Sequence, residues 1–260
     1  LMYLRRNNRS VGLKFLFVTL SKPLHILEFN KVSPFMTADL QGAQNVRNGK
    51  RVTVNMVSDV VCPWCIVGYQ RLQEAIKTLD NIEVDIKFHP FELNPNMPEE
   101  GQNLREHIME KYGISEQQSA QNRARLVEAG EQLGFSFNFT DDSRMQNTFK
   151  AHQLIHFAAE NGLEEEMKLA LFSAYFTDGK NINDIGVLVE LAQTVGLDKS
   201  EAEQNLKGEK YAQAVREEET VWMQRGIQSV PTFVIGNQGV AGAQEPATLA
   251  AFIAQAASQQ

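Results

Sequence analysis

Hydrophobic and polar residues alternate in two short stretches in the first third of the chain. In the first stretch, residues 51–61, Val52, Val54 and Met56 alternate with polar neighbours. The second stretch alternates without a break from Ile82 to His89. A period of two predicts a half-buried strand in each stretch.

The segment between these strands has helical spacing instead. Pro63 suits the first turn of a helix, because that position needs no backbone N–H donor. Strand, helix and strand within about forty residues form a βαβ unit, which we expect to be parallel and right-handed. The apolar residues that recur at steps of three and four along the predicted amphipathic helix are Ile66, Tyr69, Leu72, Ile76 and Leu79.

The middle of the chain is predicted to be helical, and its end returns to strands. Residues 104–225 have helical periodicity or composition, interrupted by glycines where helices would end. Residues 232–235 predict a strand, residues 236–239 a hairpin loop, and the residues after them a short return strand. A last helix follows Pro246. The predicted order is therefore βαβ, a long helical block and ββα.

The first 50 residues differ from the rest. Basic residues precede a six-residue apolar run at 15–20, which is short for a secretory signal and lacks a small-residue cleavage site after it. We predict a leader without stable structure, or a start site placed too far upstream with Met36 as the true start. The sequence has no run of the roughly 20 apolar residues that a membrane span requires. We therefore predict a cytoplasmic protein without membrane partners.

Composition narrows the class of protein. The chain has 260 residues, of which 43% are hydrophobic, a formal net charge of -7 and two cysteines. Two cysteines are too few for a secreted scaffold held by disulfides, and the negative charge argues against nucleic acid as a partner. A chain of this length buries enough surface to be stable without disulfides or metal. The cysteines are therefore candidates for chemistry.

The two cysteines form the motif Cys62-Pro63-Trp64-Cys65, at the junction of the first strand and the helix. A CxxC pair in that position is typical of redox proteins. Unpaired backbone N–H groups and the helix dipole favour a thiolate at Cys62. Cys65 is predicted to be less exposed and to resolve a mixed disulfide. Trp64 is predicted to be exposed and to contact substrate.

Three other interpretations of the cysteine pair compete with redox chemistry, and one of them, two unrelated buried cysteines, is not expected at this spacing with Pro63-Trp64 between them. A zinc site usually needs four ligands, and the sequence has one CxxC pair without a second, so we expect no metal. A redox fold that uses its cysteine pair only for binding stays open. His152 and His156 lie one helical turn apart but lack the glutamate of a zinc protease motif. We interpret these histidines as packing or surface residues, and Trp222 as a core residue.

A second element, Ser229-Val230-Pro231-Thr232, lies directly before the last strands. A proline there can mark a strand edge. In a chain that also contains the CxxC motif, we predict instead that Pro231 is a cis proline close to the sulfurs. The backbone of Val230 would then be free to pair with an extended thiol substrate.

Four segments together resemble the DsbA-like thioredoxin superfamily. Within it the chain is most similar to the FrnE branch, which is related to 2-hydroxychromene-2-carboxylate isomerases and kappa-class glutathione transferases. The resemblance covers about residues 51–258. The segments are the CxxC motif with Val57-Ser58-Asp59 before it, and residues 89–95, 147–152 and 230–233.

The resemblance implies an α/β fold: a thioredoxin fold (βαβ…ββα) with a large all-helical insertion. Residues 51–100 and 226–260 would form the thioredoxin-like domain, and residues 101–225 the inserted helical domain. It also implies that Cys62 is the nucleophile, Cys65 the resolving cysteine and Pro231 the cis proline. Pro63 and Trp64 would support the site.

One position departs from thioredoxin, whose buried acid lies six residues before the first cysteine. Met56 occupies that position here. Proton transfer to and from Cys65 must then use water or another group. Asp59 is a weak candidate, because it is expected near the surface end of the strand. His89 ends a strand near the predicted catalytic edge, where it would tune the Cys62 thiolate or face solvent.

The predicted function is thiol-disulfide exchange with protein or low-molecular-weight thiols. No bound cofactor is expected, and glutathione is a candidate co-substrate. The alternatives are a glutathione-dependent isomerase or transferase, whose first cysteine position is typically a serine, and a non-catalytic binding module or chaperone. The resembled branch is commonly cytoplasmic. The direction of exchange, the substrate and the oligomeric state do not follow from the sequence.

Overall fold

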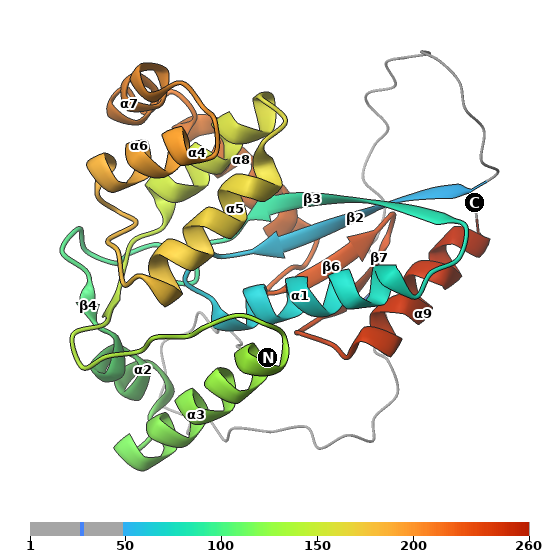
Figure 1. Ribbon diagram of the computed structural model, residues 1–260, viewed down its shortest axis with the longest axis horizontal. Helices are drawn as coiled ribbons and strands as arrows, with labels where there is room; N and C mark the ends of the chain where they lie inside the picture. Colours follow the sequence, from blue (N-terminus) through green and yellow to red (C-terminus); the bar gives the residue numbers. More distant parts are fainter. Residues whose placement is uncertain (1–26, 29–48, 260) are drawn as a thin grey trace.

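A five-stranded sheet lies at the centre of the computed structural model, which describes residues 27–28 and 49–259 (Figure 1). The strand order is β1-β7-β6-β2-β3. Strands β2 and β3 are parallel, and the other neighbours are antiparallel. The strands are β1 (Leu27–Glu28), β2 (Lys50–Ser58), β3 (Ile82–Pro90), β6 (Thr232–Ile235) and β7 (Gln238–Ala241).

Strand β2 lies inside the sheet between β3 and β6, and it ends at Ser58, before the predicted end at residue 61. The backbone N–H of Cys62 donates to the carbonyl of Asp59 at 3.1 Å, which closes a turn. Val60 and Val61 lie in this turn and are buried. Their apolar side chains continue the hydrophobic pattern of the strand, although the backbone there no longer forms a strand. This turn aims the chain from the sheet into the next helix.

Two helices pack against each other beside the sheet. They are α1 (Pro63–Lys77) and α9 (Pro246–Ser258). Both start with a proline in the first turn, where a missing N–H costs nothing. α9 also contacts β2, so the strand that leads into the CxxC motif is packed against a helix as well as paired within the sheet.

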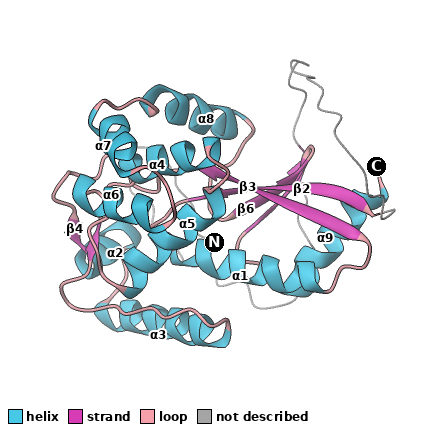
Figure 2. Ribbon diagram, turned by 45° about the horizontal axis from the view of Figure 1, so that its top comes forward, coloured by secondary structure: helices cyan, strands magenta, loops and turns pink. Residues whose placement is uncertain are grey.

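The remaining helices lie between β3 and β6 in sequence and gather at the end of the sheet toward which β2 points (Figures 1 and 2). Of these, α5 and α8 contact β3 directly. The insertion consists of α2 (Leu104–Tyr112), α3 (Glu116–Gln132), α4 (Phe149–Glu160), α5 (Glu164–Phe172), the π-helix η1 (Ser173–Thr177), α6 (Ile185–Thr194), α7 (Lys199–Lys207) and α8 (Ala212–Gln224).

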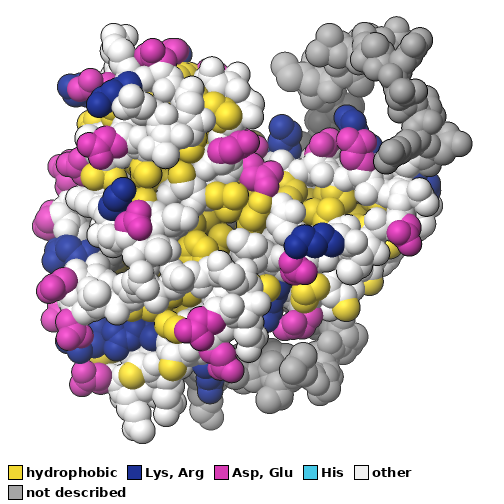
Figure 3. Space-filling view, in the orientation of Figure 1, with side chains coloured by type: hydrophobic (Ala, Val, Ile, Leu, Met, Phe, Trp, Pro, Cys, Tyr) yellow, Lys and Arg dark blue, Asp and Glu magenta, His cyan; other side chains and the backbone are white. Residues whose placement is uncertain are grey.

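The space-filling view shows how this insertion meets the sheet. Hydrophobic atoms gather at the middle of the displayed face, between the helical block and the sheet with α1 (Figure 3). Acidic and basic side chains are interspersed around them. A single set of buried hydrophobic residues runs from β2 through α1 into α4, α5 and α9. The insertion and the sheet therefore share one core.

The structure corrects three details of the sequence prediction. Residues 133–148 of the block predicted as helical contain no helix, and β5 (Arg144–Met145) pairs there with β4 (Gln102–Asn103). Three phenylalanines at a spacing of two give this segment an extended pattern and pack with Phe176. The turn before β7 takes residues 236–237 only.

The third correction concerns the predicted leader. Leu27–Glu28, placed in that leader, form β1 and pair with β7. The rest of the leader prediction, including Met36, lies outside the described residues. Within the described ranges, no helix is both long and apolar enough to cross a membrane.

Gly68 allows α1 to approach the segment before β6. A Cβ atom at this position would lie 3.0 Å from Pro231 Cγ and 3.1 Å from Phe233 Cζ. Alanine favours the helix by up to about 1 kcal/mol, but crowding of this kind costs about 1–3 kcal/mol. We expect Gly68→Ala to lower the free energy of unfolding by about 1–2 kcal/mol in urea titrations.

Gly186→Ala is the matched control. Gly186 is an exposed glycine in α6, and a Cβ there would approach only the end of the Asp184 side chain. The control should leave the stability unchanged or raise it. Equal losses in the two variants would contradict the role assigned to Gly68.

Candidate active site

The dithiol lies at the start of α1. Cys62 is the N-cap residue of this helix, and Cys65 is in its first turn. The backbone N–H of Cys65 donates to the Cys62 carbonyl at 2.9 Å. Both residues are free thiols and both are buried. The turn that follows β2 thus positions both thiols at the start of α1.

The Cys62 thiol faces the segment before β6. Its sulfur donates to the Val230 carbonyl across 3.8 Å, and the Val230–Pro231 peptide bond is cis. The Val230 carbonyl is therefore engaged in the reduced state, whereas the sequence predicted it to be free. It loses this donor when Cys62 gives up its proton.

Two hydrogen bonds fix this segment. The Thr232 hydroxyl donates to the Ser229 carbonyl at 2.7 Å, and the Gly242 N–H donates to the Pro231 carbonyl at 2.7 Å. The second bond ties the segment to the end of β7. Cys62 and Val230 are thus held next to each other although they lie 168 residues apart in sequence.

The two thiols have different environments. Burial raises the pKa of the Cys65 thiol well above its ordinary value, and the neighbouring Cys62 adds to this through a hydrogen bond and its charge. A backbone hydrogen bond from Asp59 and the charge of Lys168 act in the opposite direction. Cys65 therefore keeps its proton more firmly than an ordinary thiol.

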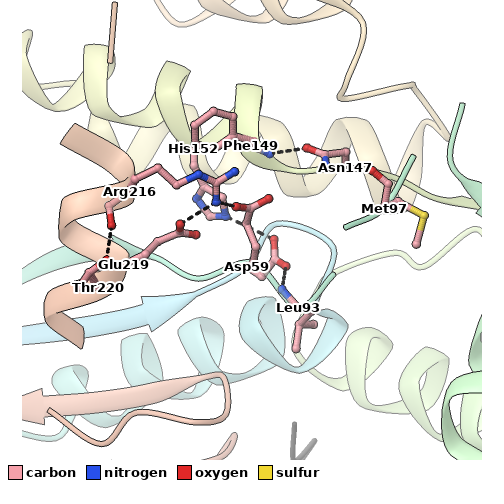
Figure 4. A network of polar contacts seen from close by, with 10 residues as sticks. Asp59, Leu93, Met97, Asn147, Phe149, His152, Arg216, Glu219 and Thr220 are labelled. Atoms are coloured by element: carbon pink, nitrogen blue, oxygen red, sulfur yellow. Dashed lines mark hydrogen bonds and ion pairs between the residues drawn. The ribbon is translucent and has the colours of Figure 1, made fainter. Parts of the chain in front are cut away.

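Asp59 is fully buried, so the expectation that it lies near the surface is wrong. Figure 4 shows its carboxylate between Leu93 and His152. Its Oδ2 accepts from the Leu93 N–H at 2.7 Å, and its Oδ1 lies 3.4 Å from Nε2 of His152. The loop after β3 and helix α4 cover this residue. The alternation of residues in the strand could not predict that Asp59 is buried, because the segments that bury it are distant in sequence.

His152 is consequently part of the site and not only a packing residue. It is buried on α4, and its Nε2 has no hydrogen-bond partner among the described residues apart from the ion-pair contact with Asp59. His156, one turn later, has a different partner, because its Nδ1 lies 4.0 Å from a carboxylate oxygen of Glu218.

A second polar group lies beside Asp59 (Figure 4). The guanidinium of Arg216 on α8 contacts the carboxylate of Glu92, lies 2.9 Å from Glu219 and stacks 3.7 Å from the Phe149 ring centre. Burial, and then the charge of Glu219, raise the pKa of Glu92 to about 7, against the opposing charge of Arg216. Glu92 thus titrates near neutral pH.

His89 has partners away from the sulfurs. Its Nδ1 lies 2.5 Å from Glu218, its Nε2 lies 2.8 Å from the Asn55 side chain, and its ring packs on buried Trp222 at 4.4 Å. These contacts join β2, β3 and α8. The tuning of Cys62 by His89 stays a prediction. Trp64 was expected to be exposed, but it is half-buried and packs against the core.

Lys168 was missed by the sequence analysis. This α5 residue is 1% exposed, and its Nζ donates to the carbonyl of Ser58, the last residue of β2, at 3.5 Å. Burial lowers the pKa of Lys168. Its position three and four residues before Leu171 and Phe172 places it on the apolar side of the helix, which was the available signal.

No group of three or more potential ligands for a metal ion is found within the described ranges. The site instead consists of two thiols, the segment containing Pro231, and charged side chains buried behind them.

Comparisons with known proteins place this geometry in a family. Residues 53–254 match the DSBA-like thioredoxin domain. The chain belongs to this family. It is 33% identical over 193 residues to the uncharacterized protein YwbO of Bacillus subtilis (strain 168). This alignment covers 74% of this chain and 90% of YwbO.

Solved structures of DSBA-like proteins share the architecture. The probable DsbA oxidoreductase SCO1869 from Streptomyces coelicolor superposes with a TM-score of 0.75 and 31% identity, covering 80% of this chain and 91% of that one. The cytosolic disulfide reductase DsbM from Pseudomonas aeruginosa has a TM-score of 0.56 and 19% identity, and the match covers 80% of this chain and 100% of the DsbM chain. The predicted DsbA-like thioredoxin fold is confirmed.

The buried Glu92 carboxyl predicts a pH-dependent stability. Its pKa is about 7 in the folded protein and near 4.5 ordinarily, so folding takes up a proton between these values. The free energy of unfolding therefore falls as the pH rises through this window, by at most about 3 kcal/mol. We expect Glu92→Gln to remove this component, measured by urea titration of the reduced protein from pH 5 to 8.

Glu100→Gln, at an exposed position in the nearby loop, is the surface control. The difference in stability between Glu92→Gln and the unmodified protein should grow as the pH rises. Parallel curves for these two proteins would show that Glu92 does not take up the proton.

Proposed function

We propose that this protein catalyses thiol-disulfide exchange, with Cys62 as the nucleophile and Cys65 as the resolving thiol. The observation that carries the proposal is the position of the Cys62 sulfur, at the N-terminus of α1 and 3.8 Å from the Val230 carbonyl. The helix dipole and the N–H groups of its first turn favour a thiolate there. Cys65 is one turn deeper and holds its proton through burial.

In the reducing direction, the Cys62 thiolate attacks a substrate disulfide and releases one substrate thiolate. Cys65 then loses its proton and attacks the Cys62 sulfur, which frees the second substrate thiolate and leaves a Cys62–Cys65 disulfide. The protein gives up two electrons and the substrate accepts them. In the oxidising direction, a substrate thiolate attacks Cys62 of the disulfide and expels Cys65.

Substrate would bind along the segment containing Pro231. The Val230 backbone offers hydrogen-bonding groups to an extended chain, as in strand addition, and half-buried Trp64 and Pro63 lie next to Cys62 in the motif. Protein thiols and low-molecular-weight thiols are the proposed substrates. Glutathione is a candidate because DsbM, which shares this fold, has been solved with GSH.

Two findings support the proposal. The family is DSBA-like, and SCO1869, at 31% identity, is described as a probable DsbA oxidoreductase.

Placement in the FrnE branch follows from the sequence resemblance. A cytoplasmic location is part of the proposal, in line with the cytosolic DsbM. The ratio of reduced to oxidised protein in glutathione buffers would give the direction of exchange.

The rival function is a glutathione-dependent isomerase or transferase. It would need Cys62 or its thiolate to bind and activate glutathione without a second thiol. The retention of Cys65 behind Cys62 favours exchange, because a resolving thiol has no use in that chemistry. A non-catalytic binding module would use neither thiol.

Trapping of a mixed disulfide tests the mechanism. In Cys65→Ser the resolving thiol is absent, so the Cys62 adduct with an oxidised substrate should accumulate and be seen as a mass increase of the intact protein. Cys62→Ser should reduce insulin more than tenfold more slowly than the unmodified protein, because the nucleophile is lost.

The pair of variants separates the functions. Full reduction of insulin by Cys65→Ser without an adduct would contradict the dithiol mechanism. Activity that survives in Cys65→Ser only with glutathione and an organic substrate would favour the isomerase or transferase. A lack of turnover in the unmodified protein would favour a binding module.

A further inference from the structure

The amine of Lys168 is buried behind the dithiol with few partners. An ammonium group has three N–H donors, yet within the described part of the chain Lys168 has one hydrogen bond, the 3.5 Å contact with Ser58. Its Nζ otherwise faces the rings of Phe88 and Phe172, at 5.9 and 5.5 Å. Burial of an incompletely paired charge is costly, so this position calls for an explanation.

The charges that act on Lys168 come mainly from the active site. Burial has the largest effect and lowers the pKa of Lys168, while the charges of Cys65, Asp59, Glu164 and Cys62, in that order, raise it. No carboxylate lies within ion-pair distance of Lys168 in the residues that the structure describes. The amine therefore has no permanent counter-ion, and its principal charge partner is a thiol whose charge changes during the proposed reaction.

A pocket of about 160 Å³ connects this amine with polar groups nearer the surface. It lies between β3, α4, α5 and α8, and it has room for several water molecules. Besides Lys168 and Glu164, the titratable groups that line it are Lys87, His89, His152, His156 and Glu218. Protons can thus pass between Lys168 and solvent without crossing the substrate side of Cys62.

The residue at the position of the buried thioredoxin acid cannot exchange a proton with Cys65 in place of Lys168. Met56 is fully buried in β2 and cannot transfer a proton. Asp59 contacts Cys65 through its backbone, and its carboxylate is engaged by Leu93 and His152. The helical insertion thus supplies a basic group where the sheet lacks an acidic one.

We propose that Lys168 exchanges a proton with Cys65 during resolution, with the pocket as the route to solvent. This inference rests on the proposed function. The amine takes the Cys65 proton, the Cys65 sulfur bonds to the Cys62 sulfur, and the Cys62–substrate bond breaks to release a thiolate. The ammonium then passes its proton to water in the pocket. In the opposite direction, Lys168 returns a proton to Cys65 as that sulfur is expelled.

Resolution can be followed separately from attack. An aromatic disulfide that releases a coloured thiolate should give two phases with the reduced protein: a concentration-dependent one from Cys62 and a concentration-independent one from Cys65. In Lys168→Met we expect the pH midpoint of the second phase to rise by about one unit, which slows it about tenfold at pH 7. The two rates should converge at high pH, where Cys65 ionises unaided.

Lys87→Met is the matched control, because Lys87 lines the same pocket from an exposed position. Its second phase should keep the unmodified midpoint. Lys168→Gln repeats the test with a polar side chain. An unchanged second-phase profile in folded Lys168→Met or Lys168→Gln would overturn the inference. Absence of a second phase in the unmodified protein would instead overturn the proposed function.

A measurement on the unmodified protein covers the case in which neither variant folds. With ¹⁵N-labelled lysine, the pKa of the Lys168 amine should be higher in the dithiol form than in the disulfide form, because only the dithiol form can place a negative sulfur beside it. Equal values in the two redox forms would also overturn the inference.

Discussion

The contact between the start of α1 and the segment before β6 is the constraint on which the site depends. It places the Cys62 sulfur against the Val230 carbonyl, and it requires a helix that can approach a proline ring closely. The parallel pairing of β2 with β3 and the antiparallel pairing of β2 with β6 bring these segments to the same end of the sheet. Hydrogen bonds from Thr232 and Gly242 then leave the segment little freedom.

The helical insertion supplies further side chains around the site that this contact positions. α4 contributes His152, α5 contributes Lys168 and α8 contributes Arg216, and all three contact the chain at or just after the ends of β2 and β3. His152 and Lys168 are buried, whereas the Arg216 side chain is half exposed, so the charge of Lys168 acts on its neighbours through a medium of lower dielectric constant than that of Arg216 does. The pKa of the Cys65 thiol therefore depends on its burial and on Cys62, and also on the charge of Lys168 in the inserted helices.

The local elements of the fold followed from the sequence because local patterns determine them. Alternation in β2 and β3, spacing in α1 and the CxxC motif at their junction correctly predicted that the cysteine pair lies between β2 and α1. Local patterns could not predict the environment of residues that are buried by segments distant in sequence. Asp59 was expected near the surface, Trp64 was expected to be exposed, and Lys168 was not recognised. A lysine on the apolar side of a helix was the one local sign of that buried charge.

The hydrogen bond between Lys168 and Ser58 joins the last residue of β2 to the insertion. It has a consequence for protein engineering. A shortened chain in which a simple loop replaced the helices between β3 and β6 would retain both cysteines and Pro231. It would also open the end of β2 to water and leave the Asp59 carboxylate without His152. A module for transplantation into another protein would therefore have to include the inserted helices as well as the thioredoxin-like half.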